Sequence, residues 1–238
     1  MTISKSADRS ASQQHQSPPT LFSWLNQHAT TALFVIMSLV YLSSVHLTPY
    51  EWQFAVKGLP ILLLIAVCIR SLSGKDKLWM TTALSFSLAG DVFLALPIAN
   101  SFVFGLGAFL VAQCCYAIYF FTLKRDTGVA ITNRVCIIAI IGFGCAMAIH
   151  LLPKTGVLLI PVTIYLCAIS AMAVMAFYRD VHLWTKIGVM SFLASDAILA
   201  QSLFAQALPY SSLWVMSTYY IAQFFIMHGI ILQRQSNA

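Results

Sequence analysis

The chain alternates between long apolar segments and short polar ones. Each apolar segment is close to the roughly 20 residues that a helix needs to cross the hydrocarbon core of a bilayer. The eight segments cover residues 29–47, 54–70, 78–97, 102–123, 135–152, 157–178, 184–204 and 212–232. The pattern therefore predicts an all-α, polytopic membrane protein with eight transmembrane helices.

The polar stretches at the two ends lie outside this helical region. We expect three parts: a flexible cytoplasmic tail over 1–28, an eight-helix transmembrane domain over 29–232, and a short cytoplasmic tail over 233–238.

Composition supports the membrane interpretation. Of the 238 residues, 60% are hydrophobic and 8% are charged, whereas soluble domains have about 45–50% apolar and about 25% charged residues. The net charge of +6 comes from single basic residues scattered between the apolar segments. Such a distribution is typical of membrane topology signals and argues against a nucleic-acid partner. The cysteines show no metal-ligand spacing, so no metal site is expected.

The basic residues predict the orientation of the chain. With the amino terminus inside, Lys154 alone falls in an outer loop and Lys57 falls within a span. Eleven basic residues then lie on the cytoplasmic side: Lys5, Arg9, Arg70, Lys75, Lys77, Lys124, Arg125, Arg134, Arg179, Lys186 and Arg234. By the positive-inside rule both termini are expected in the cytoplasm, in the inner membrane if the source is bacterial.

Short similarities indicate an internal repeat. Residues 89–95 (AGDVFLA) match residues 194–200 (ASDAILA). Two further pairs of residues correspond in the same order: Pro60 with Pro161 before these segments, and Gln113 with Gln223 after them. We hypothesise two parallel four-helix repeats, related by an axis along the membrane normal.

Two acidic residues lie well inside predicted spans. Asp91 is in the third and Asp196 in the seventh, near the midplane or in the outer half of the bilayer. An ionised carboxylate there costs about 2.5–3.5 kcal/mol or more, so such residues are functional by default. Lys57 enters the second span from the outer side. These three groups are expected to share one outward-facing cavity.

Several roles are open to these groups. Each aspartate could join helices by pairing with Lys57 or a tyrosine, and Lys57 could extend toward the interface. Paired carboxylates also suit acid–base catalysis or a proton relay in a transporter, and spacing alone does not choose between the two. The polar residues expected to line the same cavity as substrate contacts are Asn100, Gln113, Tyr116, Tyr219, Tyr220 and Gln223.

Five motifs together resemble the YhhN-type lysoplasmalogenase family. They are FSLAGDVFLALP (Phe86 to Pro97), FVFGLGAFLVAQCCY (Phe102 to Tyr116), SFLASDAILA (Ser191 to Ala200), STYYIAQFFIMHG (Ser217 to Gly229) and Lys57-Gly58-Leu59-Pro60. The similarity extends from about residue 30 to residue 232. Gln113 departs from the His expected in many relatives, which argues against a proton-transfer role at this position.

The resemblance implies hydrolysis of the vinyl ether bond of lysoplasmalogens, without a metal or an organic cofactor. The partners would be a lysophospholipid substrate and membrane lipid. Protonation of the β-carbon gives an oxocarbenium ion, water adds, and the hemiacetal collapses to a fatty aldehyde and glycerophospho-ethanolamine or glycerophosphocholine. We hypothesise that Asp196 is the acid and Asp91 the base. Lys57 would hold the ionised aspartate or meet the substrate phosphate.

Two rival functions remain at this stage. One is a proton-coupled secondary transporter that uses the intramembrane Asp pair. The other is a non-catalytic lipid-binding or scaffolding protein in which the carboxylates only pair.

Overall fold

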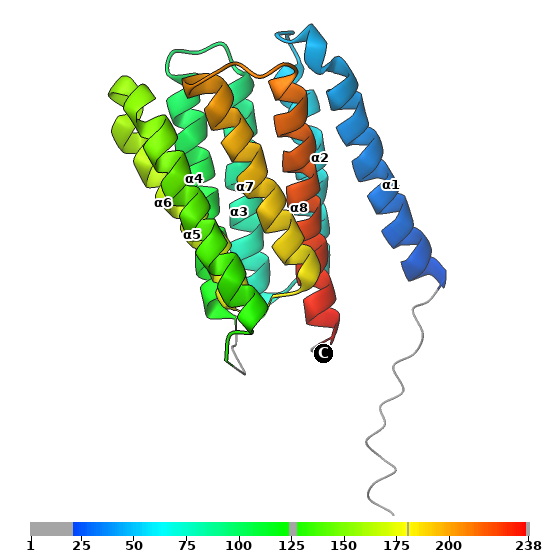
Figure 1. Cartoon of the computed structure of the whole chain (residues 1–238). Helices are drawn as coiled ribbons and strands as arrows, with labels where there is room; N and C mark the ends of the chain where they lie inside the picture. The colour runs from blue at the N-terminus through cyan, green and yellow to red at the C-terminus, as the bar shows by residue number, and fades with distance from the viewer. Residues whose placement is uncertain (1–20, 124–127, 180, 237–238) are drawn as a thin grey trace, which may run out of the picture.

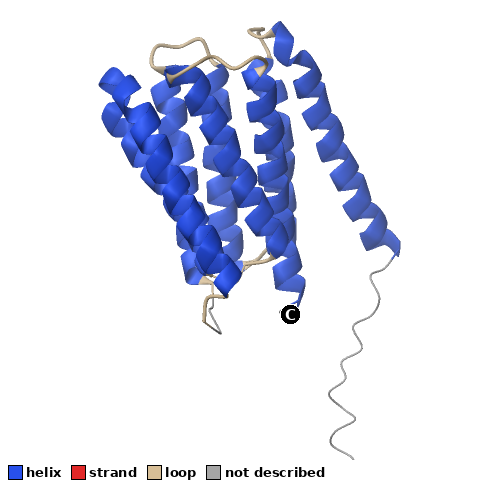
Figure 2. Cartoon of the chain, viewed as in Figure 1, coloured by secondary structure: helices blue, strands red, loops and turns tan. Residues whose placement is uncertain are grey.

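All regular structure in the described residues is helical. The computed structural model describes residues 21–123, 128–179 and 181–236, with residues 21–27 described as backbone only. Within these ranges there are helices and loops but no strand (Figure 2). The helices are α1 (Leu21–Ser44), α2 (Gln53–Ser71), α3 (Gly74–Ala95), α4 (Ser101–Thr122), α5 (Ile131–Leu151), α6 (Leu159–Tyr178), α7 (Leu183–Phe204) and α8 (Ser211–Ser236).

The predicted spans correspond to these helices. Each of the eight in the described ranges is long and apolar enough to cross a membrane, which confirms the predicted fold class. Helix α1 begins at Leu21, before the first apolar segment, and α8 continues to Ser236, beyond its predicted end at 232. The two polar tails stay predictions. Residues 1–20, with Lys5 and Arg9, and the loop with Lys124 and Arg125 lie outside the described residues.

The helices run up and down in one bundle (Figure 1). Short connections make consecutive helices antiparallel. The closest neighbours are α3 with α4 and α7 with α8, while α2 packs on α3 and α4 packs on α6. Helix α1 lies at one edge, against α2 and α8. The start of α1 and the end of α8 lie at the same end of the bundle.

Two glycines explain the closest helix contacts. A Cβ atom on Gly90 would lie 2.6 Å from the ring of Phe109 in α4. A Cβ atom on Gly188 would lie 2.7 Å from the backbone nitrogen of Ile226 in α8. Small residues allow helices to approach closely inside a membrane, where packing drives association. Because Gly90 precedes Asp91, the α3–α4 contact also fixes the position of that carboxylate.

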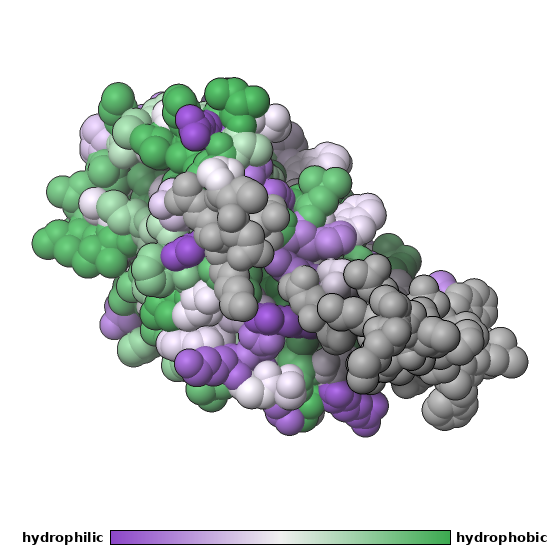
Figure 3. Space-filling view, turned by 90° about the horizontal axis from the view of Figure 1, so that it is seen from below, coloured by the Kyte–Doolittle hydropathy of each residue, from purple (hydrophilic) through white to green (hydrophobic). Residues whose placement is uncertain are grey.

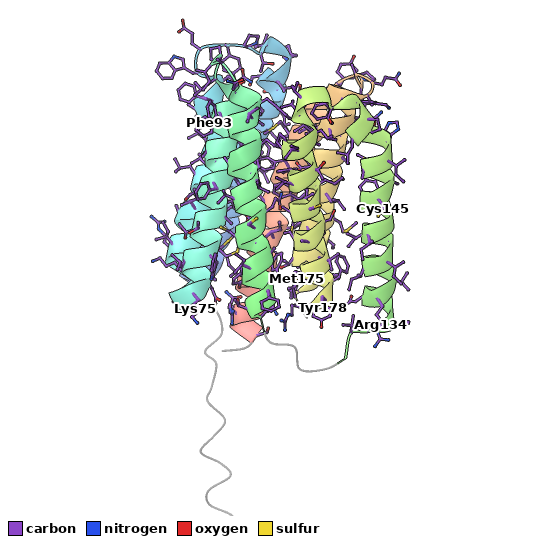
Figure 4. The ribbon with its side chains drawn as sticks, turned by 90° about the vertical axis from the view of Figure 1, so that its left-hand side faces the viewer. Lys75, Phe93, Arg134, Cys145, Met175 and Tyr178 are labelled. Atoms are coloured by element: carbon purple, nitrogen blue, oxygen red, sulfur yellow. The ribbon has the colours of Figure 1, made fainter. Side chains whose placement is uncertain are left out.

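Helix α5 is one of the two least buried helices among the described residues. Its buried residues are Ile140 and Leu151, whereas the Ile138 and Ile149 side chains are 70% and 78% exposed. Figure 4 shows α5 at the edge of the bundle, with Cys145 midway along it. Exposed apolar side chains over the length of a helix are expected where lipid is the solvent. Most of the α5 surface therefore faces lipid.

Hydrophilic side chains gather at the end of the bundle that holds the termini. Figure 3 looks onto this end, and Figure 4 shows Lys75, Arg134 and Tyr178 there, with Phe93 at the opposite end. Asp76 and Arg234 join α3 to α8 by an ion pair of 2.6 Å. The grouping agrees with the predicted cytoplasmic side, and the orientation itself stays a prediction.

A cavity that holds two intramembrane carboxylates

A cavity of about 490 Å³ occupies the half of the bundle opposite the chain termini. Its wall takes residues from all eight described helices and is mostly apolar. Lys57, Asp91 and Asp196 all line it, as do Tyr165 and Tyr219. Its size lies within the range of small-ligand sites, and the pattern of apolar walls with a few polar groups is typical of them. The three predicted ionisable groups thus share one cavity.

Asp91 has a cation and a phenol as partners. Lys57 Nζ lies 3.2 Å from Asp91 Oδ1, and the Tyr219 hydroxyl donates to Oδ2 over 2.7 Å. The Lys57 and Asp91 side chains are only 8% and 1% exposed. Each carboxylate oxygen therefore has a donor, and the buried charges of the lysine and the aspartate compensate one another.

The Lys57 backbone is held by a second tyrosine. Pro60 lies inside α2, and its missing N–H leaves the carbonyl of Val56 without its usual helical donor. The Tyr220 hydroxyl donates to the next carbonyl, that of Lys57, over 2.8 Å. This hydrogen bond ties α8 to α2 one residue from the interruption. Successive tyrosines of α8 thus hold the carboxylate of Asp91 and the backbone of its lysine partner.

Asp196 has different surroundings. Its partner in the described part of the chain is the Tyr165 hydroxyl of α6, which donates to Oδ2. No salt bridge joins Asp196 to any described basic residue, although the residue is half-buried. The neighbouring Ser195 donates to the carbonyl of Val215 over 2.9 Å and so ties α7 to α8 beside the carboxylate.

A layer of polar residues lies behind the wall of this cavity. The Tyr116 hydroxyl donates to Gln223 Oε1 over 2.7 Å. Gln113 and Ser87 belong to the same layer, and the Ser87 hydroxyl lies beside that of Tyr116. All four side chains are fully buried. Of the predicted substrate contacts, Lys57 and Tyr219 line the cavity. Behind it lie Gln113, Tyr116, Tyr220 and Gln223.

Asn100 lies beside the lining residue Ser101 but does not itself line the cavity, and its role as a substrate contact stays a prediction. Asn100 is exposed in the connection before α4 and is not among the lining residues. Its φ of 60° is in the left-handed region, which asparagine tolerates better than most residues. The turn therefore explains why an asparagine stands at this position.

Sequence reasoning missed Tyr165. It is a polar aromatic residue in an otherwise apolar segment, and a phenol buried in a membrane usually needs a hydrogen-bond partner. That signal could have selected it, whereas its pairing with Asp196 depends on how α6 packs near α7. Gln53 and Tyr41 also line the cavity and were not predicted.

Comparison with known proteins adds an independent result. The model of the YhhN family matches residues 52–230. The lysoplasmalogenase of Mycobacterium bovis is 30% identical over 187 residues, which cover 77% of this chain and 72% of the relative. Lysoplasmalogenase TMEM86B is 33% identical in Sus scrofa and 32% identical in Homo sapiens, in each case over 72% of both chains. No solved structure matches the chain significantly.

Proposed function

The chain belongs to the YhhN family, and from this premise we propose that it is a lysoplasmalogenase. It hydrolyses the vinyl ether bond of lysoplasmenyl-ethanolamine or lysoplasmenyl-choline within the membrane. The observation that carries the chemical part of the proposal is the pair of unlike carboxylates, Asp91 and Asp196, in one cavity. The names of the relatives support the same substrate class.

Asp196 is the general acid in this proposal. No described basic residue forms a salt bridge with it, and an unpaired carboxylate in a low-dielectric site avoids charge by binding a proton. The Tyr165 hydroxyl donates to Oδ2, which leaves Oδ1 to carry the proton toward the cavity. Proton donation by a positioned side chain typically accelerates a reaction by about 10²–10⁴-fold.

Asp91 is the base in this proposal. Lys57, 3.2 Å from Oδ1, stabilises its ionised form. A carboxylate that is already in place can stabilise the oxocarbenium ion and accept a proton from the attacking water. Because Lys57 is engaged in this pair, the structure favours its role as partner of Asp91 over direct contact with the substrate phosphate.

The proposed reaction transfers one proton to carbon and consumes one water molecule. Asp196 gives its proton to the β-carbon of the vinyl ether, and the positive charge spreads over the adjacent carbon and oxygen. Water adds to that carbon while Asp91 takes one of its protons. The hemiacetal then breaks its bond to the glycerol oxygen, and its own hydroxyl proton passes to that oxygen. The products are a fatty aldehyde and glycerophospho-ethanolamine or glycerophosphocholine.

The cavity suggests how the lipid lies. Its polar lining residues near the end opposite the termini include Thr48, Gln53 and Ser211, and its remaining wall is mostly apolar. We place the head group near these polar residues and the hydrocarbon chain along the apolar wall. With both termini in the cytoplasm, the head group would enter from the outer side of the membrane.

The two rival functions make different predictions. A proton-coupled transporter would move a solute without consuming the vinyl ether, and neither the family nor the relatives' names support it. If the carboxylates only join helices, then Asp91→Asn and Asp196→Asn change stability but not turnover. The Asp91–Lys57 contact alone fits this second reading, whereas the presence of Asp196 in the same cavity favours catalysis.

The decisive experiment is an aldehyde-release assay on the purified protein in detergent. The substrate is lysoplasmenyl-ethanolamine, and the matching ester lysophospholipid is the control. We expect aldehyde from the vinyl ether, no hydrolysis of the ester, and loss of activity in Asp91→Asn and Asp196→Asn. Near-native activity in both folded variants would rule out the two-carboxylate mechanism, and hydrolysis of the ester instead would identify a different lipase.

A further inference from the structure

The buried polar layer forms a connection between the two carboxylates. From Asp91 it passes to Tyr219, whose hydroxyl lies close to Gln223 and Tyr116. On the other side, Gln113 lies beside the hydroxyl of Tyr165, which donates to Asp196. Gln113 and Tyr116 are neighbours on one face of α4, three residues apart. The chain of polar groups from Asp91 to Asp196 is therefore continuous except for the space around Gln113 and Gln223.

Several polar atoms in that space have no partner in the described residues. They are Ser87 Oγ, both polar atoms of the Gln113 amide, and Gln223 Nε2. The three side chains are fully buried. Buried polar groups almost always have a hydrogen-bond partner, and a buried water molecule typically makes about three hydrogen bonds to such groups. The layer thus has the donors and acceptors of an internal water site.

The proposed reaction creates a need for such a site. After each turnover Asp91 holds a proton taken from water, and Asp196 has lost its proton to carbon. The next turnover requires the reverse arrangement. Both carboxylates line a mostly apolar cavity, and in the proposed function the bound lipid fills this cavity and excludes bulk water from them.

We propose that water bound by Ser87, Gln113 and Gln223, together with the hydroxyls of the layer, returns the proton from Asp91 to Asp196. This inference depends on the proposed function. Asp91 gives its proton to the Tyr219 oxygen, and Tyr219 passes its own proton to the water. From the water and Tyr116 a proton passes to the Tyr165 oxygen. Tyr165 gives its own proton to Asp196. Every relay oxygen gains and loses one proton, so only the two carboxylates change.

The glutamines hold the water and do not themselves transfer protons. This role is consistent with an amide at position 113, where the sequence argued against proton transfer. It also gives a use to both members of the Gln113–Gln223 pair of the hypothesised repeat. The relay residues act through the carboxylates, so they are positioning and relay groups and not catalytic residues.

The test separates the first turnover from later ones. Tyr116→Phe interrupts the layer while leaving the direct partners of Asp91 and Asp196 in place. Rapid mixing with lysoplasmenyl-ethanolamine should give a first turnover close to that of the wild type, about one aldehyde per enzyme, followed by a steady-state rate at least roughly tenfold lower. Gln113→Met, which removes the water-holding atoms without losing much volume, should show the same pattern.

The matched control is Tyr119→Phe. Tyr119 is on the same helix and 1% exposed, but its hydroxyl lies near Arg234, away from the layer. We expect this variant to keep the wild-type ratio of first-turnover rate to steady-state rate. Imidazole, a small permeant buffer whose protonated form is a weak acid, should restore steady-state turnover in Tyr116→Phe, because it can carry the proton that the relay no longer carries. A purely structural defect would not respond to the acid.

Three outcomes would overturn the relay. They are a Tyr116→Phe steady-state rate within twofold of the control, an equal fall of both phases, and no response to the weak acid. These outcomes differ from failure of the proposed function, in which the wild type releases no aldehyde or Asp196→Asn keeps its first turnover. Thermal unfolding of each variant, in the same detergent, identifies any variant that is simply unfolded, and Gln113→Met then decides the question.

Discussion

The two carboxylates have nearly the same local sequence but different surroundings. Asp91 has a lysine and a tyrosine as partners, both from other helices, and is almost fully buried. Asp196 has a tyrosine partner, and no described basic residue forms a salt bridge with it. The chemical difference between the two sites therefore comes from the helices packed around them, and not from the matching segments that carry the carboxylates.

The hypothesised repeat shows where the difference arises. Lys57 lies three residues before Pro60, whereas Leu158 lies three residues before Pro161. Tyr165 lies four residues after Pro161, whereas Leu64 lies four residues after Pro60. If the repeats share an origin, each half has gained one polar partner that the other lacks. A symmetric pair could thus become an acid and a base without any change in the carboxylates themselves.

The largest expected effects are those of the carboxylates. Asp196→Asn and Asp91→Asn should each reduce aldehyde release by about 10²–10⁴-fold, because each removes a proton donor or acceptor. Azide needs no base to attack the oxocarbenium ion, so we expect it to restore vinyl ether consumption in Asp91→Asn but not in Asp196→Asn. Substrate consumption is followed by chromatography. Rescue of Asp196→Asn alone would reverse the assignment of acid and base.

A large effect on stability is expected for the lysine. Lys57→Met leaves Asp91 as an unpaired buried charge, which typically costs about 3–5 kcal/mol. The double variant Lys57→Met, Asp91→Asn removes both charges and should recover a large part of that loss. Reversible unfolding in mixed micelles measures the free energy of unfolding. A double variant less stable than Lys57→Met would show that the ion pair is not what couples these residues.

The two tyrosines next allow a direct comparison of the carboxylates. Tyr219→Phe removes a hydrogen bond to an ionised Asp91 and should cost about 1.5–3 kcal/mol of unfolding free energy. In the proposed mechanism Asp196 rests in its neutral form, so Tyr165→Phe removes a hydrogen bond to a neutral group and should cost about 0.5–1.5 kcal/mol. The same mixed-micelle unfolding measurement gives both values. If Tyr165→Phe were the more costly change, the proposal that Asp196 rests in its neutral form would be wrong.

The smallest expected effect is that of Asn100→Ala. Asn100 is exposed and is not itself a lining residue, although Ser101 next to it is, so kcat and KM should be unchanged. Stability should change by no more than about 0.5 kcal/mol, the usual range for a surface position. Steady-state kinetics on lysoplasmenyl-ethanolamine provide the check. A KM raised severalfold would return Asn100 to the substrate site, as the sequence first suggested.

The helices and the shared cavity were predictable because both follow from local rules. The length of an apolar segment specifies a membrane helix, and depth along antiparallel helices brings Lys57, Asp91 and Asp196 to one level. Partners across helices were less predictable. In the sequence, Tyr165 does not differ from the other aromatic residues of the apolar segments. Its contact with Asp196 depends on the packing of α6.

The rotation of each helix about its own axis also escaped prediction. Gln113 and Gln223 were expected to line the cavity, but both are fully buried and neither is a lining residue. An apolar helix with few polar residues gives little indication of which side faces inward, because lipid and protein core are equally apolar. Asn100 shows a different limit of sequence-based prediction. An asparagine that adopts the left-handed conformation of a turn cannot be distinguished in the sequence from one that binds a ligand.

Helix α5 divides its surface between two apolar surroundings. Phe143, Met147 and Leu151 contribute to the cavity wall, which surrounds the lipid chain in the proposed function, while Ile138, Ile141 and Ile149 are exposed. Both surroundings accept any aliphatic or aromatic side chain of suitable size. Mutation can therefore widen or narrow this wall without disturbing the acid, the base or their partners. Preference for short, long or unsaturated chains could diverge among species through α5 alone, while the chemistry stays the same.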